Sequence, residues 1–172
     1  LYQLLKTYSD MALISKEGGG IGWYFGNVRP GDTYTQKVPK ANKINKWIKI
    51  VNDIAVAVNQ RGIRKGAITP ALDWWHLDVK EFCEIKSELN GDLRDKAFDI
   101  FPQVVVDTYF IDAVIEGREI YQYNQYEYNK LTGVNITELK GTPLYEAHKL
   151  ADNLILSGNL SQIIKKKAKA LC

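Results

Sequence analysis

A run of glycines, Gly18 to Gly20 with Gly22 two positions later, is the first feature of this 172-residue chain that could bind a ligand. Glycine lets backbone N–H groups approach a ligand oxygen closely and adopts positive φ without steric cost, so such a run can cradle a phosphate. Dinucleotide-binding loops and P-loops run from a strand through the glycines into a helix. This run instead follows a helical pattern and precedes a strand pattern, so a tight helix-to-strand turn is the equal alternative.

A second segment, residues 59–66, combines cations with carboxamides. Arg61 and Arg64 lie beside Asn59 and Gln60 in a stretch that also holds two glycines. The guanidinium fork of arginine binds phosphate oxygens, and amide side chains bind the edges of bases, so the segment suits a nucleotide. Cations at the end of a helix are also favourable for dipole reasons alone. A solvated basic loop is therefore the alternative.

The remaining reactive side chains give weaker signals. His76 and His148 lie far apart in the sequence, and neither has a second His or Cys at ligand spacing, so we expect no metal site. We expect His76 to be packed and hydrogen-bonded, and Cys83 to be a buried small hydrophobic residue. No nucleophile with an adjacent base is visible. The residues themselves thus indicate a phosphorylated ligand and do not indicate a reaction.

The composition excludes several classes of protein. With 45% hydrophobic and 25% charged residues, the chain has the makeup of an ordinary globular protein, not of a disordered or collagen-like one. The 23 basic and 20 acidic residues nearly balance, which argues against a nucleic-acid binder. The most apolar window, residues 48–58, is interrupted by Lys49, Asn52 and Asp53, so we expect no membrane span. Two cysteines cannot build a disulfide framework, and we expect the cytoplasm.

Helix and strand patterns alternate along the chain. Apolar residues recur with helical spacing in residues 1–15, 43–58, 78–88, 108–116, 139–156 and 160–171. Aromatic and β-branched runs predict strands over residues 21–25, 67–72, 101–106 and 119–126, the third of them buried. This alternation predicts an α/β fold with at least some parallel pairing. Too few strands are present to close a barrel, so we expect residues 1–172 to form a single partial domain.

Two further patterns concern packing. The tyrosines of the last predicted strand alternate as if on one face: Tyr121, Tyr123, Tyr126 and Tyr128. The lysines of the last predicted helix are expected on its solvated face: Lys165, Lys166, Lys167 and Lys169. Both ends of the chain read as helix without a start or stop signal, so we expect a piece of something longer.

Four motifs together resemble the large subunit of class I ribonucleotide reductase. In order they are Ser15-Lys16-Glu17-Gly18-Gly19-Gly20-Ile21-Gly22, Val28-Arg29, residues 59–67, and Trp75-His76-Leu77-Asp78-Val79. Their order and the gaps between them also agree with that family. The likeness runs over nearly the whole chain but over only a part of such a subunit.

The resemblance implies the N-terminal part of a ten-stranded α/β barrel, incomplete in this chain, from an enzyme that makes deoxyribonucleotides for DNA synthesis by radical chemistry. The helices at residues 1–15 and 43–58 would pair with their copies in a second subunit, and an allosteric deoxynucleoside triphosphate would bind at that interface. Lys16 and Arg29 would contact the phosphates of this effector. Residues 29–42 would form the first specificity loop.

The second specificity loop, between effector and substrate, would carry four named residues: Asn59, Gln60, Arg61 and Arg64. The backbone of Gly19 and Gly20 would line the substrate site. The resemblance further implies ribonucleoside diphosphate substrates, ATP among the effectors, and a thioredoxin- or glutaredoxin-type reductant. It implies a homodimer of large subunits and a small subunit that generates the radical with a diiron or dimanganese cofactor. This chain itself would hold no cofactor or metal and would bind neither nucleic acid nor membrane.

The departures from the family are as informative as the matches. The Asn-x-Cys-x-Glu motif of the thiyl-radical cysteine does not occur, and Cys83 does not match it. The redox cysteine pair and the radical-transfer tyrosines are also missing. We therefore expect no catalytic residue here and no reduction by this chain alone. Two alternatives stay open, a non-catalytic nucleotide-binding or dimerisation module and a segment of an adenosylcobalamin-dependent reductase.

Overall fold

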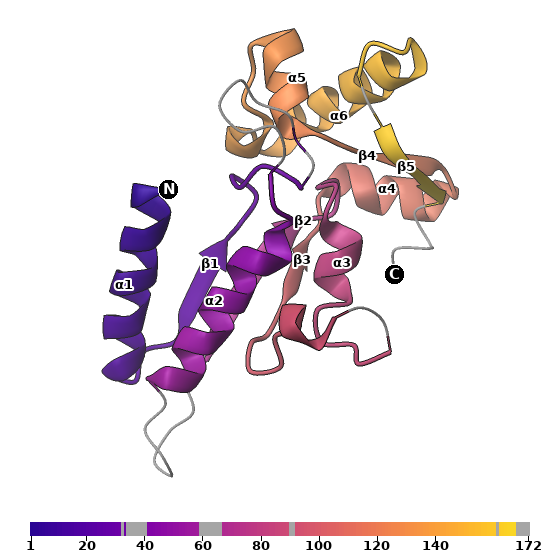
Figure 1. Cartoon of the computed structure of the whole chain (residues 1–172). Helices are drawn as coiled ribbons and strands as arrows, with labels where there is room; N and C mark the ends of the chain where they lie inside the picture. The colour runs from indigo at the N-terminus through magenta and orange to yellow at the C-terminus, as the bar shows by residue number, and fades with distance from the viewer. Residues whose placement is uncertain (32, 34–40, 59–66, 90–91, 161, 168–172) are drawn as a thin grey trace.

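The computed structural model describes residues 1–31, 33, 41–58, 67–89, 92–160 and 162–167, with side chains described up to residue 160. A parallel sheet with the order β1-β2-β3 lies at the centre of the first half of the chain (Figure 1). Its strands are β1 (Ile21–Tyr24), β2 (Ile68–Asp73) and β3 (Gln103–Val105). Ile21 pairs with Ile68, and Ala71 pairs with Gln103. The three described strands form an open sheet and not a closed barrel.

Helices α1 (Tyr2–Lys16) and α2 (Ile44–Ala57) pack against the first two strands, and α2 makes the crossover from β1 to β2. Between them the Tyr8 hydroxyl donates a hydrogen bond to the Trp47 carbonyl at 3.0 Å. The inner face of α2 is fully buried through Ile44, Ile48 and Val51, because apolar residues recur there with helical spacing. The short helix α3 (Val79–Cys83) and the 3-10 turn η1 (Leu93–Asp95) lie beside α2.

The second half of the chain forms a separate core above the carboxyl ends of the parallel strands (Figure 1). Its elements are α4 (Thr108–Glu116), β4 (Glu119–Tyr123), α5 (Gln125–Thr132), η2 (Ile136–Glu138), α6 (Gly141–Leu156) and β5 (Gln162–Lys167). Strands β4 and β5 pair antiparallel. Trp74 and Trp75, which follow β2 directly, belong to this second core and so join the two halves.

Side-chain caps fix where the helices of the second half begin. The Asp107 carboxylate accepts a hydrogen bond from the Phe110 amide at the start of α4, and the Asn124 side chain accepts one from the Tyr126 amide at the start of α5. Both helices end at a glycine with positive φ, Gly117 at 69° and Gly133 at 72°. These caps specify α4 over the residues that the periodicity predicts.

Most of the predicted elements are confirmed, two are shorter than expected and one is wrong. The strand expected over residues 119–126 ends at Tyr123, because the Asn124 cap starts α5, so Tyr126 and Tyr128 lie on a helix. The helix expected over residues 160–171 is the strand β5 over Gln162–Lys167. Ile164 pairs with Gln122 and the three lysines after it pair with residues 119–121 of β4, and this pairing outweighs the helix propensity of the lysines. The helix expected over residues 78–88 is shortened to α3.

Burial also differs from expectation at three places. The valines expected in a buried strand are 39% (Val104), 41% (Val105) and 47% (Val106) exposed, because β3 lies at the sheet edge among the described residues. Cys83 is exposed on the outer side of α3 instead of buried. Val51, on a helix expected to pair with a second subunit, is fully buried within the chain. No helix in the described part of the chain is long and apolar enough to cross a membrane.

Candidate functional site

The glycine run forms the turn between α1 and β1 and sits at the amino end of the sheet. Gly18 has a φ of 82°, which side chains rarely adopt, and a Cβ on Gly19 would lie 2.7 Å from Cγ2 of Ile14. Gly20 faces the Ala67 carbonyl, 4.0 Å from where its Cβ would be, so the run touches the residue that follows segment 59–66. The turn alone accounts for Gly18 and Gly19. Gly20 is exposed.

Arg29 lies at the opposite, carboxyl end of the sheet, shortly after β1. It lines a cavity of about 440 Å³ together with Leu1, Leu4 and Trp47 from the amino-terminal parts of α1 and α2. It also borders a smaller polar cavity of about 300 Å³ whose other walls include Gln125 and residues of α5 and η2. A half-buried guanidinium between two cavities is suited to bind an anionic ligand.

The structure does not bring Lys16 and Arg29 together within one chain. Lys16 is the last residue of the 15-residue helix α1, whereas Arg29 shares its cavity with Leu1 and Leu4 at the first turn. A helix of that length rises about 22 Å, and Figure 1 shows α1 running from the carboxyl end of the sheet to its amino end. Lys16 therefore clusters with Gly19 and Gly20, and Arg29 stands apart.

The other predicted ligand contacts lie outside the described residues. They are Asn59, Gln60, Arg61 and Arg64. The segment that carries them connects the end of α2 to the start of β2, and the Ile21 amide donates to the Ala67 carbonyl at 2.9 Å. Ala67, which follows that segment, is thus beside the glycine run.

Sequence reasoning missed a buried carboxylate at the carboxyl end of β2. The Tyr24 hydroxyl donates a 2.5 Å hydrogen bond to Oδ2 of Asp73. Burial raises the pKa of Asp73, an effect that the hydrogen bond from Tyr24 opposes, and burial with the neighbouring carboxylate raises the pKa of Tyr24. A Cβ on Gly26 would lie 2.4 Å from the same carboxylate oxygen. Gly26 therefore permits the backbone after β1 to approach this pair. The only signal of the pair in the sequence was the aromatic end of the first predicted strand, which a glycine follows.

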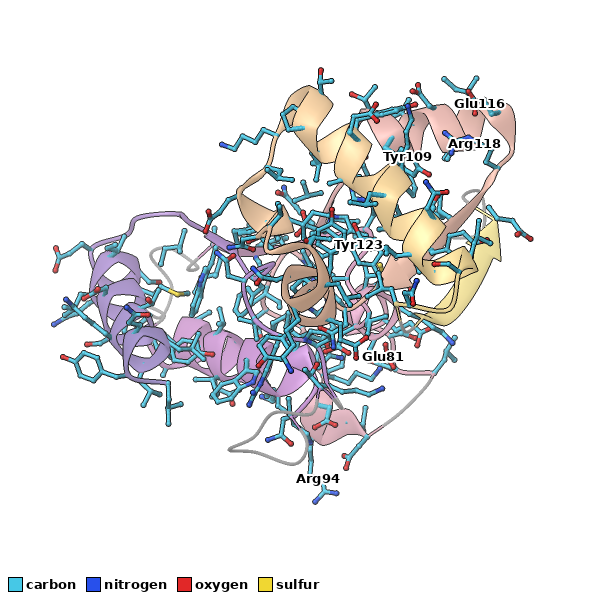
Figure 2. All side chains as sticks on the ribbon, turned by 90° about the horizontal axis from the view of Figure 1, so that it is seen from above. Glu81, Arg94, Tyr109, Glu116, Arg118 and Tyr123 are labelled. Carbon is cyan, nitrogen blue, oxygen red and sulfur yellow. The ribbon has the colours of Figure 1, made fainter. Side chains whose placement is uncertain are left out.

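A second buried network joins the two halves of the chain. The His148 Nε2–H donates to Asp107 at 2.7 Å, and the Tyr123 hydroxyl lies 2.8 Å from Nδ1 of the same ring. The indole of Trp74 also donates to Asp107 at 3.2 Å. Burial alone would raise the pKa of Asp107, but the hydrogen bond and charge of His148 hold it below its usual value. Tyr123 lies at the centre of the molecule (Figure 2) and is fully buried, so this Asp–His–Tyr network is part of the packing of the fold.

His76 is confirmed as a packed, hydrogen-bonded residue. Its Nδ1 accepts from the Asp78 amide at 3.1 Å, which places the proton on Nε2, and Nε2 donates to the Val28 carbonyl at 2.9 Å. Burial lowers the pKa of His76, although the hydrogen bond to Val28 and the charge of Asp78 act in the opposite direction. The neutral ring thus links the end of β2 to the segment before Arg29.

The His76→Gln variant should weaken the dependence of stability on pH. The unfolded chain takes up a proton at His76 near pH 6.5, whereas the folded chain, with its lowered pKa, does not, so wild-type stability falls as the pH drops from 7 to 5. We expect the slope of the unfolding free energy in this window to decrease by up to about 1.4 kcal/mol per pH unit in the variant. Denaturant titrations at several pH values measure it, and equal slopes would contradict a depressed pKa.

Comparison with known proteins connects this geometry to a family. A family model described as "Ribonucleotide reductase, barrel domain" matches residues 1–169. A Synechocystis protein named ribonucleoside-diphosphate reductase subunit alpha is 40% identical over 150 residues, which cover 87% of this chain and 19% of that protein. A Helicobacter pylori protein of the same name is 42% identical over 131 residues, 75% of this chain and 16% of that protein. A Cryptosporidium parvum ribonucleoside-diphosphate reductase large chain is 34% identical over 118 residues. The chain thus spans less than a fifth of the length of these relatives.

Proposed function

The chain belongs to the family of the ribonucleotide reductase barrel domain, and from that membership we propose that it is the effector- and substrate-facing segment of a large subunit that reduces ribonucleoside diphosphates. The relatives named above carry that activity in their names. The parallel order β1-β2-β3 with α2 as a crossover supports its place as the first strands of a larger, ten-stranded barrel. Residues 1–172 would be one partial domain of it.

One observation carries the proposal for the effector site, namely that Lys16 is the last residue of α1 whereas Arg29 lies beside the first turn of that helix. Two residues that far apart cannot hold the same phosphate chain within one subunit. In a two-fold dimer whose α1 helices run antiparallel, Lys16 of one copy meets Arg29 of the other twice. The deoxynucleoside triphosphate effector would then bind between subunits, with both cations making charge-assisted hydrogen bonds to its phosphates.

The surface available for such a dimer is the outer side of α1 and α2. Their exposed apolar residues include Leu1, Tyr2, Leu5, Leu13 and Val56. Large exposed apolar side chains that lie together on two neighbouring helices are typical of an interface. The dimer helices would therefore be those expected from the resemblance, with their exposed residues as the contacts, because Tyr8, Ile48 and Val51 are buried within the chain.

Substrate and effector would communicate through the segment at residues 59–66. Its exit at Ala67 lies beside Gly20, and we propose that the backbone of Gly19 and Gly20 lines the site of the substrate. Gln60 and Arg64, with Asn59 and Arg61, would report which base is bound. A coupling free energy of about 1–3 kcal/mol is usual between two ligands that share one bistable element.

The remaining chemistry would come from outside this chain. A small subunit with a diiron or dimanganese cofactor would generate the radical, and a thioredoxin- or glutaredoxin-type protein would restore the reduced state. Among the described residues no group of three His, Cys, Asp or Glu side chains is placed to hold a metal ion. This chain's own residues would bind and orient nucleotides, and they would transfer no electron.

The proposal is tested with single substitutions in each of the two loops, made in a complete large subunit that carries this sequence. Arg29→Ala should weaken binding of every deoxynucleoside triphosphate effector by about tenfold to a hundredfold, because a hydrogen bond to a charged group contributes about 1.5–3 kcal/mol. Arg64→Ala should leave effector affinity within about twofold and flatten the effector-dependent choice of substrate. Calorimetric titrations and substrate-competition assays with a small subunit present measure the two effects.

Arg94→Ala is the matched control. Arg94 is an exposed arginine that pairs with Asp92 by hydrogen bonds of 2.5 and 2.9 Å, and it points outward at the rim of the molecule (Figure 2). Its removal should change neither the effector affinity nor the effector-dependent choice of substrate. Loss of effector binding in Arg64→Ala with the preference pattern intact at saturating effector would overturn the assignment of roles.

A further inference from the structure

Buried polar side chains from two distant parts of the chain hold the segment around Arg29 in place. Hydrogen bonds reach the backbone or side chains at Gly26, Val28, Gly31 and Thr33. The residues that make them follow β2 or β4, so they lie 47 to 99 positions away in sequence. They are His76, Asp78, Asn124 and Gln125, each less than a tenth exposed.

Asp78 joins the two ends of the segment between Gly31 and Ile44. Its Oδ2 accepts hydrogen bonds from the Gly31 amide and from the Ile44 amide, both at 2.9 Å. The second of these also caps the first turn of α2. A Cβ on Gly31 would lie 2.6 Å from Cγ and 3.0 Å from Cα of Lys43, so the two ends are in direct contact and leave no room for a side chain. The carboxylate therefore holds the two ends of this segment together.

His76 and Gln125 hold the residues just before Arg29. The Nε2 atoms of both side chains donate to the same Val28 carbonyl at 2.9 Å, and Gln125 donates also to the Gly26 carbonyl at 3.1 Å. These two carbonyls flank Asn27, and Val28 is the direct neighbour of Arg29. The main chain that carries the guanidinium is thus attached on one side to β2 and on the other to the start of α5.

Asn124 completes the attachment behind Arg29. Its Nδ2 donates to the Thr33 hydroxyl at 3.0 Å, and that hydroxyl donates in turn to the Pro30 carbonyl at 2.7 Å. The same Asn124 side chain caps α5 through its Oδ1. One residue therefore fixes both the helix and the backbone that leads away from Arg29.

We infer that His76, Asp78, Asn124 and Gln125 form a clamp that positions Arg29 for the effector, and that through Asn124 and Gln125 the second half of the chain sets effector affinity. The inference rests on the proposed effector role of Arg29. A guanidinium on a fixed backbone loses less freedom when a phosphate binds, so binding is tighter than from a mobile segment. All four are positioning residues that act on Arg29 through its backbone, although Gln125 also borders the smaller cavity beside Arg29.

Gln125→Glu in a complete large subunit carrying this sequence is the test. The variant keeps size and shape but replaces the NH₂ donor of two hydrogen bonds by an oxygen that faces two carbonyl oxygens, which should release the backbone at Gly26 and Val28. We expect effector dissociation constants to rise about tenfold, with turnover at saturating effector within about twofold of wild type. A residue with a merely structural role would lower both together.

Gln122→Glu is the matched control. Gln122 is also a buried glutamine of the same region, but its Nε2 faces the Trp74 carbonyl at 3.5 Å and not the Arg29 segment. Gln122→Glu should lower the stability of the fold about as much as Gln125→Glu does, and it should leave the effector dissociation constant unchanged. A tenfold weakening by both variants would overturn the inference.

Hydrogen exchange separates this inference from the proposed function. The amide of Gly31 is protected through Asp78 and the amide of Val28 through the Phe25 carbonyl at 2.8 Å, and both should exchange faster in Gln125→Glu than in Gln122→Glu. Asp78→Leu should expose the Gly31 amide most, whereas Asp78→Asn, which keeps an acceptor oxygen, should restore much of its protection. Unchanged exchange would overturn the clamp. If Arg29→Ala left effector binding intact, the proposed effector role would fail, and exchange alone would decide on the clamp.

Discussion

Effector binding should be lost in two single variants of the large subunit and partly restored when the two are mixed. Lys16→Ala and Arg29→Ala each remove one cation from every effector site, and each should weaken binding by about tenfold to a hundredfold. In a dimer that contains one subunit of each kind, one site takes both substitutions and the other takes neither. The untouched site should bind with wild-type affinity. This follows because Lys16 ends α1, whereas Arg29 lies beside the first turn of the same helix.

The number of restored sites is a quantitative check. Random pairing of equal amounts gives about half mixed dimers, so about a quarter of all sites should be tight. Calorimetric titration or equilibrium dialysis measures that fraction, and the double variant Lys16→Ala with Arg29→Ala, mixed with wild type, serves as the control. A site built within one subunit would carry one substitution in every mixed dimer. No tight sites would then form, and the intersubunit effector site would be refuted.

Val51→Asp should unfold the chain, whereas Ile50→Asp one position earlier should be nearly neutral. Val51 is 0% exposed and packs in the core between α2 and the sheet, while Ile50 is 38% exposed. A buried carboxylate without a partner, together with lost packing, should remove about 4–5 kcal/mol, most of the stability of an ordinary domain. The exposed position should cost less than about 0.5 kcal/mol.

Denaturant unfolding of both variants measures the difference, and light scattering adds the oligomeric state. If Val51→Asp folded normally but dissociated a dimer, Val51 would belong to an intersubunit face after all. Substitution of Leu5 or Leu13, which are exposed on α1, is the change that we expect to weaken self-association without unfolding.

The sequence was a good guide where one face of an element decides its structure. The apolar spacing of α2 and the Asp-to-Gly boundaries of α4 are local signals, so both helices were predicted within one or two residues. The strand at the end of the chain was not predictable, because β5 exists through its ladder with β4, whose paired residues lie 39 to 48 positions apart. The exposure of Val104 likewise depends on which strands lie beside β3 and not on its own composition.

The candidate site shows the same division between local and distant information. The spacing of motifs identified the family, and the glycine run was correctly placed between helix and strand. Nothing in the spacing of Lys16 and Arg29 indicates that α1 keeps them apart. The clamp residues were missed as a group because each is an ordinary polar residue in sequence, and only folding brings Gln125 to the carbonyl of Gly26.

The strand β3 gives the molecule a direction in which its sheet can grow. Its outer edge carries backbone donors and acceptors that no described strand uses, and Val104 and Val105 leave both of its faces partly uncovered. An open edge of this kind is a template for any extended peptide, whether the next strand of the same protein or an unrelated chain. In a cell, the interval between the synthesis of β3 and the arrival of its neighbour is therefore the period in which this protein is most exposed to aggregation, and a chaperone that recognises extended apolar segments would find its target there.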